Sequence, residues 1–175
     1  MLFFKRCVDV IVSSLVLLVL LPLWLLIALL IKLTSRGPVL YRQERVGMDG
    51  VKFMMFKFRT MVEDAEQETG PVMCSPDDPR ITTLGRFLRK FSIDELPQLF
   101  NVLRGEMTLI GPRPLPLDEV CTGTPAERKR LSIKPGLTCL WQIAPKRNDM
   151  SFKEWMNLDL KYIDNWALSL DFKIL

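Results

Sequence analysis

The sequence of 175 residues contains no histidine. This absence excludes the Ser-His and Cys-His pairs that activate many enzyme nucleophiles. It also removes imidazole from any set of metal ligands. Chemistry in this chain therefore depends on carboxylates, lysines, arginines, thiols or hydroxyls.

Cysteines are few, and none of them forms a Cys-x-x-Cys pair. The four are scattered along the chain: Cys7, Cys74, Cys121 and Cys139. This spacing favours free thiols in a reducing compartment over a disulfide framework or a structural metal site. No internal repeat is visible either, so the length predicts one compact domain together with an anchor.

Positive charge is in excess, with a formal net charge of +4. Such a balance fits nucleic acid, anionic lipid or a phosphorylated substrate. The basic residues are dispersed, and no stacking aromatics alternate with them in a recognised motif, which disfavours nucleic acid.

Residues 10–31 form a long apolar stretch without a charged side chain. The stretch is long enough to cross a bilayer and too long for a signal peptide, and no small-residue cleavage site follows it. Pro22 lies in its middle, where it removes a backbone hydrogen bond and bends a helix. Basic residues flank the stretch on both sides: Lys5 and Arg6 before it, Lys32 and Arg36 after it. Similar flanks favour two cytoplasmic ends and hence a re-entrant hairpin broken at Pro22; a single transmembrane helix is the alternative.

Residues 37–61 predict two short strands around a turn at residues 47–50. Period-2 alternation places Phe56 and Phe58 on one face of the second strand and Lys57 and Arg59 on the other. Two adjacent cations on a strand either bind a phosphate or face water. The acidic, proline-containing segment 62–82 predicts a surface loop, in which Asp77 and Asp78 form a solvated turn or bind a metal.

Residues 84–91 predict an amphipathic helix. Leu84, Phe87, Leu88 and Phe91 recur at helical spacing, with basic residues on the opposite side. This helix either faces the core or lies at the level of lipid headgroups.

Two neighbouring acids, Asp94 and Glu95, follow this helix. Ser92 and Glu95 have capping-box spacing, and Pro97 comes just before an apolar run, which predicts a new helix with both acids in its first turn. The positive end of the helix dipole would hold both acids ionised and attract phosphate. Ordinary capping without any catalytic role is the alternative.

The C-terminal half adds cations on turns. Residues 109–114 predict a rigid turn that displays Arg113, residues 134–143 predict a turn entering a strand, and the following loop carries Arg147. Residues 151–175 are predicted to be helical at first, with Trp155, Tyr162 and Trp166 at a membrane interface or in the core.

Together these features predict an anionic substrate with a lipid end. Phosphate-rich reactants require cations and usually Mg²⁺, and a carboxylate can attack phosphorus to form a covalent intermediate.

Four segments carry a family resemblance: KFRTM, RKFSIDELPQLFNVLRGEMTLIGPRP, KPGLT and LDLKYIDNWALSLDFKIL. They resemble the bacterial sugar transferases known as small monotopic phosphoglycosyl transferases, and the likeness covers nearly the whole chain. The resemblance implies transfer of a sugar 1-phosphate from a UDP-sugar to polyprenyl (undecaprenyl) phosphate, with release of UMP, as the first membrane step of polysaccharide or glycoprotein synthesis.

The resemblance also implies residue roles. Asp94 would be the nucleophile that carries the phosphosugar, and Glu95 would help to bind Mg²⁺ or accept a proton. Lys57, Arg89, Arg113 and Arg147 would bind phosphates. Arg59 joins this set through the strand alternation.

The expected fold is α+β and mostly helical. Residues 1–36 would form the re-entrant hairpin, and residues 37–175 a compact catalytic domain with a small β-hairpin and amphipathic interfacial helices. The chain would reside in the bacterial inner membrane with its site on the cytoplasmic face. A glycosyltransferase that releases UDP and a non-catalytic scaffold that binds nucleotide sugars are the alternatives.

Overall fold

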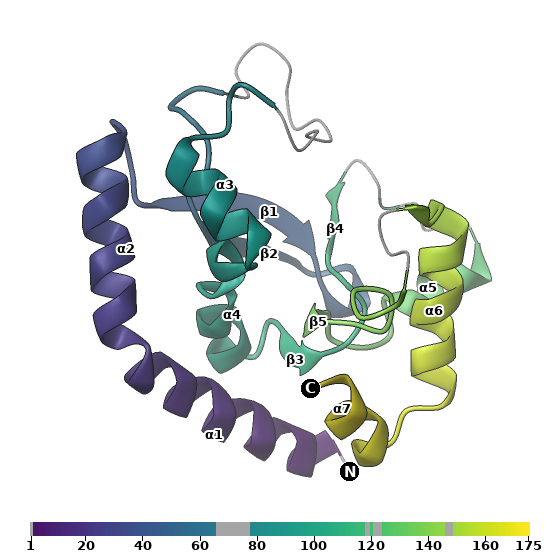
Figure 1. Cartoon of the computed structure of the whole chain (residues 1–175). Helices are drawn as coiled ribbons and strands as arrows, with labels where there is room; N and C mark the ends of the chain where they lie inside the picture. Colours follow the sequence, from purple (N-terminus) through teal and green to yellow (C-terminus); the bar gives the residue numbers. More distant parts are fainter. Residues whose placement is uncertain (1, 66–77, 118–119, 121–123, 146–148) are drawn as a thin grey trace. The chain divides into compact units, whose positions relative to one another are not determined.

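The computed structural model describes residues 2–65, 78–117, 120, 124–145 and 149–175. Its fold is mixed α/β, with about half of the chain helical and small sheets (Figure 1). The α-helices are α1 (Leu2–Val19), α2 (Leu21–Thr34), α3 (Thr83–Lys90), α4 (Gln98–Arg104), α5 (Pro125–Arg130), α6 (Phe152–Asp164) and α7 (Leu168–Ile174). The strands are β1 (Leu40–Val46), β2 (Lys52–Phe58), β3 (Thr108–Ile110), β4 (Leu115–Pro116) and β5 (Gly136–Thr138). Two short 3₁₀ turns complete the set, η1 (Met48–Gly50) and η2 (Ile93–Glu95).

Two small sheets organise the strands. The first has the order β2-β1-β4, with β1 and β2 joined by the predicted turn, and β4 pairs antiparallel with β1. The second pairs β3 and β5 in parallel, with Thr108 opposite Gly136 and Ile110 opposite Thr138. The predicted hairpin and the strand after residue 134 are therefore confirmed.

The N-terminal apolar stretch forms two helices that meet at Leu20 with a bend of 62°. Pro22 lies in the first turn of α2, where its missing N–H is tolerated. Within the described residues, no single helix is long and apolar enough to cross a membrane, whereas α1 and α2 satisfy that test as a bent pair. The break is at the predicted place.

The chain divides into two compact units. The first unit comprises Met1–Leu15, Gln43–Met55 and Gln98–Leu175, and the second unit comprises Val16–Arg42 and Phe56–Pro97. The second unit is built around four buried side chains, Ile27, Ile31, Phe58 and Leu88. The buried apolar residues of the first unit include Phe53, Val102, Met107, Ile110 and Tyr162.

Polar side chains of α1 bind other elements of the first unit. The Arg6 guanidinium donates to the carbonyls of Val102 and Leu103, at 2.5 and 2.7 Å, in the last turn of α4. The buried Asp9 carboxylate accepts from Thr108 Oγ1 at 2.7 Å and from the Leu109 N–H at 3.0 Å. A cation at a helix C-terminus and a buried acid with two donors are both favourable arrangements.

The C-terminal helix α7 is tied to the start of α1. Lys5 Nζ lies 2.6 Å from Asp171 Oδ2, and Tyr162 Oη lies 2.7 Å from Asp171 Oδ1. In Figure 1 the beginning of α1 and α7 lie side by side. Lys5 and Arg6, predicted to be flanking charges, are therefore engaged inside the first unit.

The aromatic residues of the C-terminal segment pack against protein. Tyr162 is buried, and the Trp155 ring stacks on Trp141 with centroids 4.6 Å apart. The sequence predicted that these aromatic residues lie either at a membrane interface or in the protein core. Tyr162 and Trp155 both pack against protein. Cys7 and Cys139 are free thiols as expected, whereas Cys74 and Cys121 lie outside the described residues.

Candidate active site

Strand β2 places Lys57 beside the acid pair. Phe58 is 3 % exposed and packs in the core of the second unit, where its ring meets that of Trp24 edge-on at 5.2 Å. Because side chains alternate along a strand, Lys57 points to the other face. There its Nζ lies 2.9 Å from Glu95 Oε1, and both side chains are largely shielded from water.

Helix α3 packs closely onto the backbone of Thr60, two residues after the end of β2. A Cβ at Gly85 would lie 2.0 Å from the Thr60 carbonyl oxygen, so only glycine permits this approach. The Thr82 side chain caps α3 by accepting from the Gly85 N–H at 2.9 Å. One turn further on, Arg89 Nε donates to Thr60 Oγ1 at 2.8 Å. The close approach therefore fixes the position of Arg89.

The segment after α3 differs from the sequence prediction. Ser92 has a left-handed backbone (φ 55°), ends α3 through a bond from its N–H to the Arg89 carbonyl, and makes no side-chain cap. Asp94 and Glu95 lie in the single turn η2, and α4 begins only at Gln98. The predicted capping box is wrong, because Ser92 terminates one helix and Pro97 delays the next.

The two acids have different surroundings. Glu95 is bound to Lys57, whereas no ion pair joins the Asp94 carboxylate to another described residue. Asp94 is only 8 % exposed. Burial raises the pKa of Asp94 above its usual range, while the charges of Lys57 and Arg89 lower it and Glu95 raises it further.

The acids do not lie in the first turn of the helix that follows them, as the sequence predicted. The acids precede α4 by several residues, and burial is the largest influence on Asp94. The charges of Lys57 and Arg89 and a hydrogen bond from the Asp94 backbone N–H favour the ionised carboxylate.

Arg59 has a different set of contacts from Lys57. It is 8 % exposed, and its Nη2 donates to the Ser35 carbonyl at 3.1 Å and to Ser35 Oγ at 2.6 Å. Ser35 is the C-terminal cap of α2, where a cation is favourable. In this arrangement Arg59 stabilises the end of α2, and its phosphate-binding role stays a prediction.

The remaining predicted cations lie elsewhere. The structure brings Lys57, Arg89, Asp94 and Glu95 together in the second unit. Arg113 belongs to the first unit, where its guanidinium carbon is 5.9 Å from the centre of the Trp141 ring. Arg147 lies outside the described residues, as does Asp77. Asp78, the neighbour of Asp77, is buried and bound to Arg80 at 2.7 Å, which differs from a solvated turn.

Asp94 and Glu95 are the carboxylates of this site that could hold a metal ion, and Mg²⁺ binding stays a prediction. No cluster of three or more His, Cys, Asp or Glu side chains occurs among the described residues. Magnesium, however, is commonly held by one or two carboxylates together with substrate phosphates and water. Asp94 and Glu95 provide two adjacent carboxylates for such a site.

The sequence analysis did not identify two polar residues that bind the predicted arginines. Thr60 binds Arg89, and Ser35 binds Arg59. Neither carries a local signal, because each is defined by a partner 24 or more positions away in the chain. One local feature did indicate the contact with Thr60. A glycine inside a helical pattern, here Gly85, often marks a close approach of another backbone.

The site thus combines two neighbouring acids, one of them bound to Lys57, in a chain whose N-terminal residues form a bent apolar helix pair. The chain belongs to the bacterial sugar transferase family, which it matches over residues 1–175. It is 42% identical over 184 residues to the exopolysaccharide production protein ExoY of Rhizobium meliloti, a match that covers 97% of this chain and 81% of ExoY.

Two longer relatives show the same likeness. The UDP-glucose:undecaprenyl-phosphate glucose-1-phosphate transferase of Klebsiella pneumoniae is 42% identical over 179 residues, covering 98% of this chain and 38% of the relative. Galactosyl transferase CpsE of Streptococcus agalactiae is 46% identical over 149 residues, covering 79% and 33%. The chain thus spans 38% of the Klebsiella relative and 33% of CpsE.

Proposed function

We propose that the chain transfers a sugar 1-phosphate from a UDP-sugar to polyprenyl phosphate in two steps. In the first, an Asp94 oxygen attacks the sugar-linked phosphorus, the bond from that phosphorus to the bridging oxygen breaks, and UMP leaves. In the second, an oxygen of polyprenyl phosphate attacks the same phosphorus, the bond to Asp94 breaks, and the polyprenyl diphosphosugar forms. Each step makes one phosphorus–oxygen bond and breaks one.

One observation carries this proposal: the two neighbouring acids differ in their contacts. Glu95 is bound to Lys57, whereas Asp94 has no ion-pair partner among the described residues. A nucleophile needs an oxygen that is not already committed to a counter-ion, and Asp94 meets that need. Partial burial also limits the water that competes for its oxygens.

The other residues stabilise charge. Repulsion between a carboxylate and a phosphate is the main barrier to such an attack, and cations lower it. The charge of Arg89 acts on Asp94, since it lowers the pKa of that carboxylate. Arg113 and Arg147 stay predicted ligands of substrate phosphates. Glu95 holds Lys57 in place and accepts the proton of the lipid phosphate. Asp94 and Glu95 are the residues that would hold Mg²⁺, which when bound would neutralise phosphate charge.

The relatives support this reaction through their names. The Klebsiella relative is named as a transferase of glucose 1-phosphate from UDP-glucose to undecaprenyl phosphate. ExoY, of which this chain covers most, is named for exopolysaccharide production. We assign the same donor and acceptor classes to this chain, at the start of a polysaccharide or other glycoconjugate pathway.

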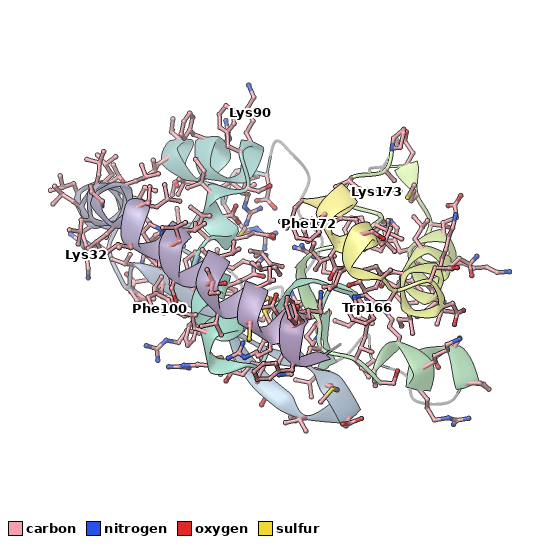
Figure 2. All side chains as sticks on the ribbon, turned by 90° about the horizontal axis from the view of Figure 1, so that it is seen from below. Lys32, Lys90, Phe100, Trp166, Phe172 and Lys173 are labelled. Atoms are coloured by element: carbon pink, nitrogen blue, oxygen red, sulfur yellow. The ribbon has the colours of Figure 1, made fainter. Side chains whose placement is uncertain are left out.

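Exposed apolar side chains support a location at the membrane. On α3, Leu88 is buried, whereas Phe87 is 54% exposed. Phe91, which directly follows the helix, is 57% exposed, and the two rings are 5.0 Å apart. Figure 2 shows Lys90 extending outward from the same helix. Aromatic rings beside a basic side chain are typical of helices at the headgroup level. Together with the exposed leucines of α2, these side chains support our proposal that the chain works at the inner membrane with its site on the cytoplasmic face.

The test is an assay of nucleotide release. Purified protein in nanodiscs is incubated with UDP-glucose or UDP-galactose and undecaprenyl phosphate, and UMP and UDP are quantified. We expect UMP, with Asp94→Asn slower by at least about a thousandfold because the nucleophile is lost. Asp49→Asn, an exposed acid in the hairpin turn, is the matched control and should retain full activity. Release of UDP would indicate transfer of the sugar alone and would contradict the proposal.

A further inference from the structure

The turn that carries Arg113 is held tightly by its backbone. The Gly111 N–H donates to the Thr138 carbonyl at 3.0 Å, and the Gly136 N–H donates to the Pro112 carbonyl at 2.8 Å. A Cβ at Gly136 would lie 2.1 Å from the Gly111 nitrogen. The backbones of the turn and of β5 are thus in direct contact, with no space for a side chain between them.

A buried ion pair holds the carbonyl of Arg113 itself. Arg130, the last residue of α5, donates from Nη2 to the Arg113 carbonyl at 2.7 Å and from Nε to Asp159 Oδ2 at 2.7 Å. Arg130 is 7% exposed, and Asp159, in α6, is 1% exposed. Figure 1 shows α5 and α6 side by side. The guanidinium therefore links α6 to the backbone of the turn.

A buried ion pair is a poor means of stabilising a fold. Removing both charges from water costs several kcal/mol per ion, and apolar residues of similar volume often give equal stability. Burial raises the pKa of Asp159, and the charge of Arg130 works against that rise. What this pair provides and an apolar pair would not is a fixed donor for the Arg113 carbonyl.

The side chain of Arg113 is also connected to α6. Its guanidinium carbon lies 5.9 Å from the centre of the Trp141 ring, a cation–π distance, and Trp141 stacks on Trp155 with an interplanar angle of 15°. Trp155 precedes Asp159 by one helical turn. Helix α6 is therefore linked to Arg113 in two ways. Arg130 connects it to the Arg113 backbone, and Trp141 connects it to the Arg113 side chain.

We propose that Arg130 and Asp159 are positioning residues for Arg113. They fix the carbonyl of Arg113, and with it the direction from which its guanidinium approaches a substrate phosphate. This inference rests on the proposed function, since it requires Arg113 to bind a phosphate of the donor or of the lipid. Neither Arg130 nor Asp159 touches substrate.

A double-mutant cycle on UMP release tests the inference. Arg130→Lys keeps a positive charge for Asp159 and removes the guanidinium that reaches Arg113. We expect it to lower kcat/KM by about tenfold to a hundredfold, the range typical of small misplacements of a binding group. In an Arg113→Gln background the same change should lower kcat/KM by less than about twofold, because its target is already absent.

A second variant and a control sharpen the result. Asp159→Asn keeps the shape of the acid and should give the same pattern, which covers the case in which Arg130→Lys does not fold. Lys129→Ala removes an exposed ion pair with Asp164 that joins the same two helices, and it should leave kcat/KM unchanged.

Two results would overturn the inference. An equal loss from Arg130→Lys with and without Arg113 would show that the pair acts on the fold as a whole. An Arg113→Gln enzyme with full kcat/KM would show that there is no phosphate contact to position. Both results differ from a failure of the proposed function, in which the unmodified protein releases no UMP.

Discussion

At the scale of single residues, two adjacent carboxylates are given different tasks by their neighbours. Glu95 is neutralised by Lys57 at 2.9 Å, while Asp94 is buried without an ion-pair partner among the described residues. The sequence shows an acid pair but not this difference, since Lys57 is 38 positions away from Glu95. The difference is what favours Asp94 as the nucleophile.

The raised pKa of Asp94 gives a prediction for pH dependence. Attack requires the ionised carboxylate, so kcat/KM should fall as the pH drops through the raised pKa, above the ordinary aspartate value of about 4. Lys57 is the largest influence that lowers this pKa. Lys57→Met should therefore move the acid limb of the pH–rate profile to higher pH.

Lys52→Met is the control for this measurement. Lys52 lies on the same strand, with an exposed side chain 3.6 Å from Glu44, and its loss should leave the acid limb in place. If the acid limb of Lys57→Met stays in place or moves to lower pH, the charge of Lys57 does not lower the pKa of Asp94, and this assignment is wrong.

At the scale of elements, local patterns predicted much of the fold. The turn at residues 47–50 identified the β1–β2 hairpin, helical spacing identified α3, and Pro22 marked the break between α1 and α2. The residues at which helices begin and end were predicted less accurately than the elements themselves. Ser92 has the sequence of a cap but ends α3, because its backbone is left-handed (φ 55°) and not in the extended conformation typical of a cap residue.

Contacts between distant elements could not be predicted. Arg59 was grouped with Lys57 by strand alternation, but β2 ends at Phe58 and Arg59 turns to Ser35. Of the apolar face predicted for α3, Leu88 faces the core while Phe87 and Phe91 remain exposed. Alternation and helical spacing describe one element and do not identify the partner that covers each face.

The contact between α3 and Thr60 gives a prediction at this scale. Gly85→Ala would place a methyl group 2.0 Å from the Thr60 carbonyl and push α3 away, together with Arg89. We expect a loss of about 1–3 kcal/mol in the free energy of unfolding and a lower kcat/KM. Thermal unfolding in detergent measures the first and UMP release the second.

Arg86→Ala is the neighbouring control for Gly85→Ala. Arg86 is exposed on the same helix, and its replacement should change the free energy of unfolding by no more than about 0.5 kcal/mol. Equal stability of Gly85→Ala and the unmodified protein would mean that α3 does not pack as described.

At the scale of the whole molecule, both ends of the bent helix pair are fixed to folded parts of the chain. The start of α1 is bound through Lys5, Arg6 and Asp9 to the first unit. The end of α2 is bound to Arg59, and its buried residues Ile27 and Ile31 belong to the core of the second unit. Each end of the helix pair therefore has its own polar contacts, and entry and exit on one side of the bilayer stays a prediction.

This arrangement predicts the topology of the two ends. Phe3→Cys and Leu33→Cys, at exposed positions of α1 and α2, should react with a membrane-impermeant maleimide from the cytoplasmic side only, in a background without other cysteines. Lys153→Cys, exposed on α6, marks the side of the first unit. Labelling of positions 3 and 33 from opposite sides would demonstrate a spanning helix instead.

The central claim is a covalent bond between Asp94 and phosphorus, and mass spectrometry of the intact protein tests it most directly. Protein incubated with its UDP-sugar alone, without the lipid acceptor, should gain the mass of one phosphosugar, mapped by peptide sequencing to Asp94 and absent in Asp94→Asn. Adding polyprenyl phosphate should remove the gained mass as product forms. An enzyme that turns over normally and never carries this mass would contradict the account.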